Sequence, residues 1–212
     1  MLTLWGIFVT SFIVALSGAL MPGPMLTVTI SQAAARGWRV GPLIVLGHGI
    51  LELSLVVAIV YGLGQILARA GVIGVIGIVG GVVLLWMGWS MVRNARKISL
   101  VIEGRKGAEP MHPVWAGILS SLSNPYWAVW WATIGLSYIA FSMKYGMPGI
   151  SSFYTGHILA DLAWYAFVSA LIHFGKRWAS DRAFQAIIAV CGFFLLGFGM
   201  YFGYSGLKYF WN

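Results

Sequence analysis

Residues 42–68 read PLIVLGHGILELSLVVAIVYGLGQILA, and Glu52 is the one charged side chain in this stretch. A helix advances about 1.5 Å per residue, so about 20 apolar residues cross the ~30 Å hydrocarbon core of a bilayer. Residues 42–68 are long and apolar enough for such a crossing. The stretch therefore predicts a transmembrane helix and sets the fold class for the rest of the chain.

Similar apolar runs fill most of the remaining sequence, at residues 4–34, 72–92, 114–141, 150–174 and 184–207. Hydrophobic residues make up 60% of the 212 residues and charged residues 8%, whereas a soluble domain carries roughly a quarter charged residues. These numbers predict an all-α integral membrane protein of six transmembrane helices. They leave no length for a separate catalytic domain, and we expect membrane lipids around the whole protein.

Basic residues gather in alternate connections between the predicted helices. One set of connections holds ten of the 13: Arg36, Arg39, Arg93, Arg96, Lys97, Arg105, Lys106, Lys176, Arg177 and Arg182. The other side holds Arg69, Lys144 and Lys208. The positive-inside rule makes the richer side cytoplasmic, which predicts a multi-pass protein of the cytoplasmic membrane with both termini outside. The same scattering argues against nucleic acid as a partner.

The chain divides into two similar halves. We expect a first three-helix repeat at residues 1–92, a cytoplasmic connecting loop at 93–113 and a second repeat at 114–212. Residues 47–52 and 156–161 both read Gly-His-x-x-x-acid, and Gly81 to Gly88 matches Gly192 to Gly199 around a Leu-Leu pair. Because three crossings reverse the side from which a chain enters, the two copies should be inverted relative to each other.

Prolines interrupt the first helix of each half. Pro22-Gly23-Pro24 lies within the first apolar run, and Asn124-Pro125 lies within the fourth. Proline lacks a backbone donor and breaks or kinks a helix, so the first and fourth helices should be discontinuous. In inverted-repeat transporters such breaks free backbone groups for a substrate near the bilayer midplane, at the interface of the repeats.

Two acids lie deep inside predicted helices. Glu52 and Asp161 are each about 15 Å from the start of their helix, near the bilayer centre, where a carboxylate costs at least ~2.5 kcal/mol. His48 and His157 precede them by four residues and therefore share their helix faces. We interpret these four residues as a substrate and proton site facing a shared cavity.

Other kinds of function remain alternatives. Two histidines and two carboxylates could instead bind a divalent metal cation as the transported solute. An enzyme is not expected, because the chain has no His-Glu-x-x-His motif and no serine clearly placed beside a histidine. A membrane scaffold without transport would leave the buried acids and the matched breaks without a role. We expect no cofactor, and the small size leaves a homodimer open.

Over its whole length the chain resembles the lysine exporter superfamily, whose LysE and RhtB branches contain small six-helix amino acid exporters. The resemblance rests on Pro22-Gly23-Pro24, on Asn124-Pro125, on Asp161 and on the total length. The family often has a lysine after the Asn-Pro pair, where this chain has Tyr126, and Glu52 is similar to an acidic position of the basic amino acid branch. The resemblance implies secondary export of amino acids or related small metabolites, coupled to protons or to the membrane potential.

Overall fold

The computed structural model describes residues 3–21, 23–67, 69–97, 111–175 and 181–211, and every regular element within them is helical. The α-helices are α1 (Leu4–Ala19), α2 (Pro24–Arg36), α3 (Val40–Ala58), α4 (Gly64–Leu67), α5 (Ala70–Asn94), α6 (Pro113–Leu122), α7 (Pro125–Trp130), α8 (Leu136–Ser142), α9 (Gly146–Gly175) and α10 (Asp181–Trp211).

The first apolar run is divided where its prolines lie. Helix α1 ends at Ala19, α2 begins at Pro24, and the two axes are bent by 79°. Pro24 occupies the first turn of α2, where a missing N–H costs nothing and the fixed φ favours helix initiation. Pro22, which we expected to contribute to the break, lies outside the described residues.

The fourth apolar run is divided in the same way. Helix α6 ends at Leu122, and α7 begins at Pro125 with Asn124 as its N-cap. A turn of π-helix at Trp131–Gly135 then joins α7 to α8. A second π turn, Ile59–Leu63, joins α3 to α4 and contains Gly62 at φ 128°, a conformation that favours glycine.

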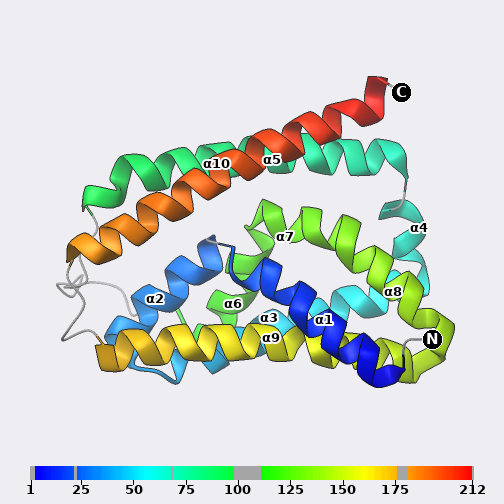
Figure 1. Cartoon of the computed structure of the whole chain (residues 1–212), viewed down its shortest axis with the longest axis horizontal. Coiled ribbons are helices and arrows are strands. Elements are labelled where there is room, and N and C mark those ends of the chain that lie inside the picture. The colour runs from blue at the N-terminus through cyan, green and yellow to red at the C-terminus, as the bar shows by residue number, and fades with distance from the viewer. Residues whose placement is uncertain (1–2, 22, 68, 98–110, 176–180, 212) are drawn as a thin grey trace.

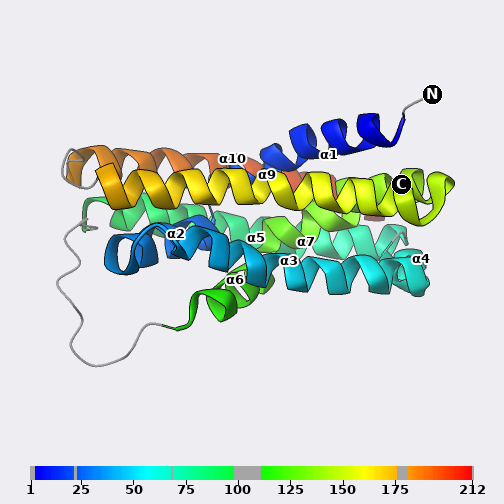
Figure 2. The same cartoon turned by 90° about the horizontal axis from the view of Figure 1, so that it is seen from below.

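The helices pack in pairs around the middle of the chain. Helices α5 and α10 lie side by side along one edge of the molecule, α1 packs on α9, and α6 packs on α3 (Figures 1 and 2). Close approach of α5 and α10 depends on glycines: a Cβ on Gly81 would lie 2.6 Å from the Gly203 nitrogen, and one on Gly206 would lie 2.7 Å from the Gly74 oxygen. Small residues at these positions let the two helix backbones approach closely.

Consecutive runs of the chain alternate in direction along the long axis. In Figure 1, α1 and α2 run from right to left, α3 returns, α5 runs left again, α6 to α8 return, and α9 and α10 repeat the alternation. The start of α1 and the end of α10 therefore lie at the same end of the molecule in both views (Figures 1 and 2).

Length and apolar composition are consistent with an integral membrane protein. Four stretches in the described part of the chain are long and apolar enough to cross a bilayer, at 40–66, 71–94, 125–175 and 188–208, and the bent α1–α2 pair is a fifth. The third stretch has 51 residues, more than twice the length that one crossing needs, and the chain turns within it at Gly146. It contains parts of two of the six helices expected from the sequence.

Two apolar clusters lie one after the other along α3 and α9. Val45 and Tyr165 belong to the first cluster, and Val56 and Phe153 belong to the second. The two Gly-His-x-x-x-acid motifs fall between these positions on their helices. Polar side chains are thus inserted between two packed apolar layers.

Candidate functional site

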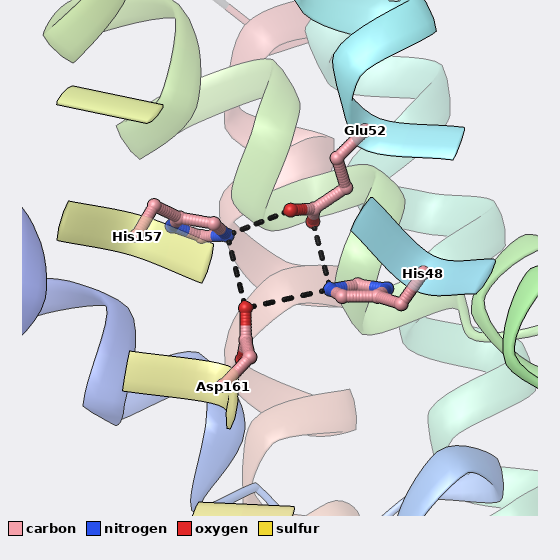
Figure 3. A group of neighbouring side chains, drawn as sticks. All are labelled: His48, Glu52, His157 and Asp161. Atoms are coloured by element: carbon pink, nitrogen blue, oxygen red, sulfur yellow. Dashed lines mark ion pairs between the residues drawn. The ribbon is translucent and has the colours of Figure 1, made fainter. Parts of the chain in front are cut away.

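Four side chains from the two repeated motifs meet between α3 and α9. His48 and Glu52 extend from α3, while His157 and Asp161 extend from α9, and the four point toward one another (Figure 3). The i, i+4 spacing of each motif places its histidine and its acid on the same helix face. We call these four residues the His–acid ring.

Each histidine of the His–acid ring contacts both acids through its Nε2 atom. His48 Nε2 lies 3.1 Å from Glu52 Oε1 and 3.5 Å from Asp161 Oδ2. His157 Nε2 lies 3.0 Å from Glu52 Oε2 and 3.5 Å from Asp161 Oδ2. These four ion pairs tie α3 to α9 with alternating basic and acidic groups (Figure 3).

The His–acid ring is shielded from the surroundings. Glu52 is 1% exposed, and Asp161, His48 and His157 are 4%, 6% and 5% exposed. Bare charges at such sites are strongly unfavourable unless they are paired. Mutual pairing is therefore what allows four ionisable groups to share this position.

Two tryptophans of the fourth apolar run donate hydrogen bonds to Glu52. The indole N–H groups of Trp127 and Trp131 both donate to Glu52 Oε1, at 2.9 and 2.7 Å. The two tryptophans are four residues apart, so they present their rings to the same face of α3. Two charge-assisted hydrogen bonds fix the position of one carboxylate oxygen.

The second nitrogens of the two histidines have different surroundings. His48 Nδ1 lies 2.7 Å from Ser121 Oγ, and the Ser121 hydroxyl has the Gly117 carbonyl as its acceptor at 2.7 Å. Ser121 Oγ thus links His48 Nδ1 to the backbone of α6. His157 Nδ1 finds no hydrogen-bond partner among the described residues, and its ring packs against Trp130, Trp131 and Phe153.

This contact corrects one expectation from the sequence, namely that no serine lies beside a histidine. A separation of 73 residues hides the pairing, which forms because α6 crosses α3 at Gly47 and Gly117. Ser121 and His48 differ from the nucleophile and base of a hydrolase, in which the serine donates its proton to the histidine. Here the serine hydroxyl donates to a helix carbonyl instead.

A small cavity adjoins the His–acid ring. Its volume is about 40 Å³, which is room for a few water molecules. It is lined by Ala15, Gly18, Ala19, Met21, Gly23, Met25, His48, Glu52, Ser121, Asn124, Tyr126, Trp127, Trp130, Trp131, His157, Asp161 and Tyr165. The two acids therefore face a shared space with aromatic and apolar walls, and they do not point apart.

The two helix breaks meet at this cavity. A Cβ on Gly23 would lie 3.3 Å from Asn124 Nδ2, so the breaks of the first and fourth runs are in contact. Helix α2 has no side-chain cap at its N-terminus, whereas the Asn124 side chain accepts from the Tyr126 N–H at the start of α7. We expected both breaks to leave backbone groups free. For the Tyr126 N–H this expectation is wrong, because the Asn124 side chain caps it.

Most of the residues predicted for the site come together. The His–acid ring, Gly23, Asn124 and Tyr126 line the cavity, while Pro24 and Pro125 stand at the first positions of α2 and α7. Sequence analysis did not predict the bonds from Trp127 and Trp131 to Glu52. The i, i+4 spacing of these tryptophans, opposite an apolar run with one acid, was the available signal.

The same four side chains also offer a set of donors for a cation. Two imidazole nitrogens and two carboxylate oxygens lie within 4.8 Å of one another. Nitrogen and oxygen donors of this kind suit borderline divalent metals. Geometry alone thus leaves an ammonium group, a proton and a metal ion as candidate occupants.

Known proteins resemble the chain over most of its length. Residues 16–206 match the LysE type translocator family. The chain is 25% identical to the "Putative amino acid efflux protein YcgF" of Bacillus subtilis over 95% of this chain and 97% of the relative. It is 26% identical to the "Chemotactic transduction protein ChpE" of Pseudomonas aeruginosa over 90% of this chain and 94% of the relative. No solved structure matches it.

The family match covers nine-tenths of the sequence. The helices that are long and apolar enough to cross a bilayer, and the buried His–acid ring beside its cavity, are consistent with membership of that family. The chain belongs to the LysE type translocator family, and it is a multi-pass membrane transporter of a small-molecule substrate, not an enzyme.

Proposed function

We propose that the protein exports amino acids or related small metabolites across the cytoplasmic membrane, and that the His–acid ring is its substrate and proton site. One observation carries this proposal: the only acids in the predicted spans, Glu52 and Asp161, converge on a buried cavity where the two helix breaks touch. An efflux relative that matches nearly end to end supports amino acids as the solute class.

Matched contacts support two inverted three-helix repeats, at residues 1–92 and 114–212. A Cβ on Gly47 would clash with the Val114 carbonyl of α6, and one on Gly156 would clash with the Phe8 carbonyl of α1. In both halves, the glycine of the repeated motif thus lies where its helix crosses the first helix of the other half. The opposite directions of α1–α2 and α6–α8 in Figure 1 also support inversion.

Basic residues support an orientation with both termini outside. The turn between α2 and α3, the end of α5 and the start of α10 lie at one end of the long axis in Figure 1, and these are the basic-rich connections. The α4–α5 connection, the α8–α9 connection and the end of α10, which carry Arg69, Lys144 and Lys208, lie at the other end, where the chain starts and finishes (Figure 1). In this topology residues 93–113 are cytoplasmic, and the His–acid ring lies near the bilayer midplane.

Complementary groups at the cavity match the two ends of an amino acid. The uncapped N-terminus of α2 and the Trp130 indole N–H, which has no acceptor among the described residues, can donate to a carboxylate. Glu52 and Asp161 can accept from an ammonium group or take up a proton in its place. Proton exchange at this site, or the membrane potential, supplies the driving force.

The described conformation is too closed for a solute of this size. A cavity of about 40 Å³ has no room for an amino acid, so the surrounding helices must separate before one binds. The ion pair between His48 of α3 and Asp161 of α9 would then break and reform in each cycle. This behaviour is what alternating access between two inverted repeats requires.

A divalent cation as the transported solute is the weaker alternative. Its support is the donor set of the His–acid ring, whereas the efflux relative and the uncapped α2 terminus favour a solute with a carboxylate. The chain also lacks the thiolates that soft metals prefer, since Cys191 is its single cysteine.

The proposal is tested by identifying what leaves the cell. Metabolites in the medium of cells with and without the protein should differ in one or more amino acids. Purified protein in liposomes should then release the same amino acid when it is loaded inside. Release of divalent cations with no amino acid flux would contradict the proposal.

A further inference from the structure

The two acids of the His–acid ring occupy equivalent motif positions but have unequal surroundings. Glu52 receives two indole hydrogen bonds on Oε1, in addition to its two histidine contacts. Among the residues that the structure describes, Asp161 has histidine contacts alone, both at 3.5 Å, and it receives no indole hydrogen bond. This inequality bears on which acid takes part in binding.

Glu52 is costly to release. Trp131 is 2% exposed, and moving Glu52 would leave its indole N–H buried without an acceptor. Trp127 donates to the same oxygen, so two donors would lose their acceptor together. Glu52 is therefore expected to keep its position and its charge throughout transport.

Asp161 is easier to release from its partners. Its contacts to His48 and His157 are 0.4 to 0.5 Å longer than those that the same nitrogens make to Glu52. If Asp161 gives up both contacts, each histidine still has Glu52 as its counter-ion. The His–acid ring can thus open on the Asp161 side without leaving a histidine unpaired.

We propose that the two acids have different tasks: Asp161 binds the α-ammonium group of the substrate, and Glu52 is a fixed anion that holds the two histidines aside. The proposal rests on amino acid export as the function. It assigns recognition of the ammonium group, and hence discrimination against solutes that lack one, to Asp161. Trp127 and Trp131 become positioning residues that act through Glu52.

Discrimination between an amino acid and its 2-hydroxy acid measures this assignment directly. Each of the twenty L-amino acids is first tested singly for release from liposomes with the wild-type protein. The one with the largest flux is then compared with its 2-hydroxy acid, which keeps the carboxylate and side chain but lacks the ammonium group. The ratio of the two apparent affinities is the readout.

We expect the wild-type protein to prefer the amino acid by at least tenfold. Asp161→Asn should bring the ratio close to one, whereas Glu52→Gln and Trp131→Phe should weaken binding of both compounds alike and keep the ratio. A ratio close to one in Glu52→Gln would overturn the assignment. This holds whether Asp161→Asn keeps the wild-type ratio or also falls to one. A wild-type protein that transports amino acids without this preference would overturn it as well.

A second measurement keeps both acids in place. The sequence has two aspartates, at 161 and 181, so 4-¹³C-aspartate in an Asp181→Asn background labels one carboxyl group. Adding the transported amino acid should shift the labelled infrared band. Glu52, labelled alone in a Glu103→Gln, Glu109→Gln background, should show no shift, and the reverse pattern would contradict the proposal.

Failure of the underlying function has a separate signature. If the wild-type protein releases none of the twenty amino acids from liposomes, amino acid export is wrong and the division of tasks falls with it. If release occurs and the ratios or the infrared bands show the wrong pattern, the function stands and only the division of tasks is lost.

Discussion

Trp131 and Trp130 are neighbours with similar burial and opposite hydrogen-bond states. The Trp131 indole donates to Glu52 at 2.7 Å, while Trp130 Nε1 has no acceptor in the described part of the chain. Both rings pack against His157. This pair of residues therefore separates the contribution of a hydrogen bond from that of an aromatic ring.

Replacing Trp131 by phenylalanine should lower the thermal stability of the purified protein. A hydrogen bond to a charged group contributes about 1.5–3 kcal/mol to stability. The substitution also leaves the buried Glu52 carboxylate without one of its hydrogen-bond donors. Trp130→Phe is the matched control, because the donor that it removes has no acceptor among the described residues. Thermal unfolding in detergent measures both, and equal losses for the two variants would contradict the role of the Trp131 bond.

Ser121 should matter for transport more than its neighbour Ser120. Both serines are buried and both donate to the Gly117 carbonyl, but of the two only Ser121 also bonds to His48 in the described structure. A net hydrogen bond of 0.5–1.5 kcal/mol corresponds to an effect of about 2- to 10-fold, so Ser121→Ala should reduce flux by that factor. Ser120→Ala should stay close to wild type, and a larger effect in Ser120→Ala would contradict this placement of His48.

Helical periodicity was enough to predict that each motif presents its histidine and its acid on one helix face. The i, i+4 spacing of His48 with Glu52, and of His157 with Asp161, gives this arrangement directly. It could not predict the indole bonds to Glu52. Those depend on how α7 lies after the break at Asn124, where it packs against α5, a helix far away in the sequence.

At the scale of elements, the helix crossings at Gly47 and Gly156 position the two motifs. Each glycine lies where a backbone carbonyl of the neighbouring helix passes, at Val114 and Phe8 respectively. Small residues at membrane helix crossings allow this close approach. The glycine before each histidine thus allows the neighbouring helix to pack close to the site.

Alanine at either crossing should destabilise the protein and reduce transport. The added methyl group would meet a backbone atom that cannot rotate away, and overpacking of this kind costs about 1–3 kcal/mol. Gly197→Ala in α10 is the control, because a Cβ there meets nothing within 4 Å. Thermal unfolding and liposome flux should both separate Gly47→Ala and Gly156→Ala from Gly197→Ala; indistinguishable variants would contradict the crossing.

The helix breaks were predictable, and the π turns were not. Proline has a defined effect on backbone hydrogen bonding, so Pro24 and Pro125 marked the start of α2 and α7. The π turn at Trp131–Gly135 has no proline to mark it. No single residue type has an effect on the backbone that marks a π turn as proline marks a helix start.

For the whole molecule, the alternation of basic and non-basic connections should correspond to the two sides of the membrane. Both chain ends lie at the end of the molecule opposite the basic-rich turns (Figure 1). This alternation was predictable from the sequence because charge at connections is a local property. The pairing of α5 with α10 was not predictable, since a glycine-rich helix face does not specify its partner.

Epitope tags at the two termini should both be accessible from outside intact cells. The positive-inside rule and an even number of crossings require them to share one side. Antibody labelling before and after permeabilisation measures this, with a tag inserted in residues 98–110 as the cytoplasmic control. Opposite accessibility of the two termini would contradict the six-crossing topology.

Release of the transported amino acid from liposomes containing the Glu52→Gln, Asp161→Asn double variant tests the central claim most directly. Both changes keep side-chain size while removing the charges of the His–acid ring, so we predict that flux falls to the level of protein-free liposomes. The Glu103→Gln, Glu109→Gln double variant, which changes two acids of the connecting loop, should keep wild-type flux. Wild-type flux in the Glu52→Gln, Asp161→Asn protein would show that the buried carboxylates do not carry the transport function.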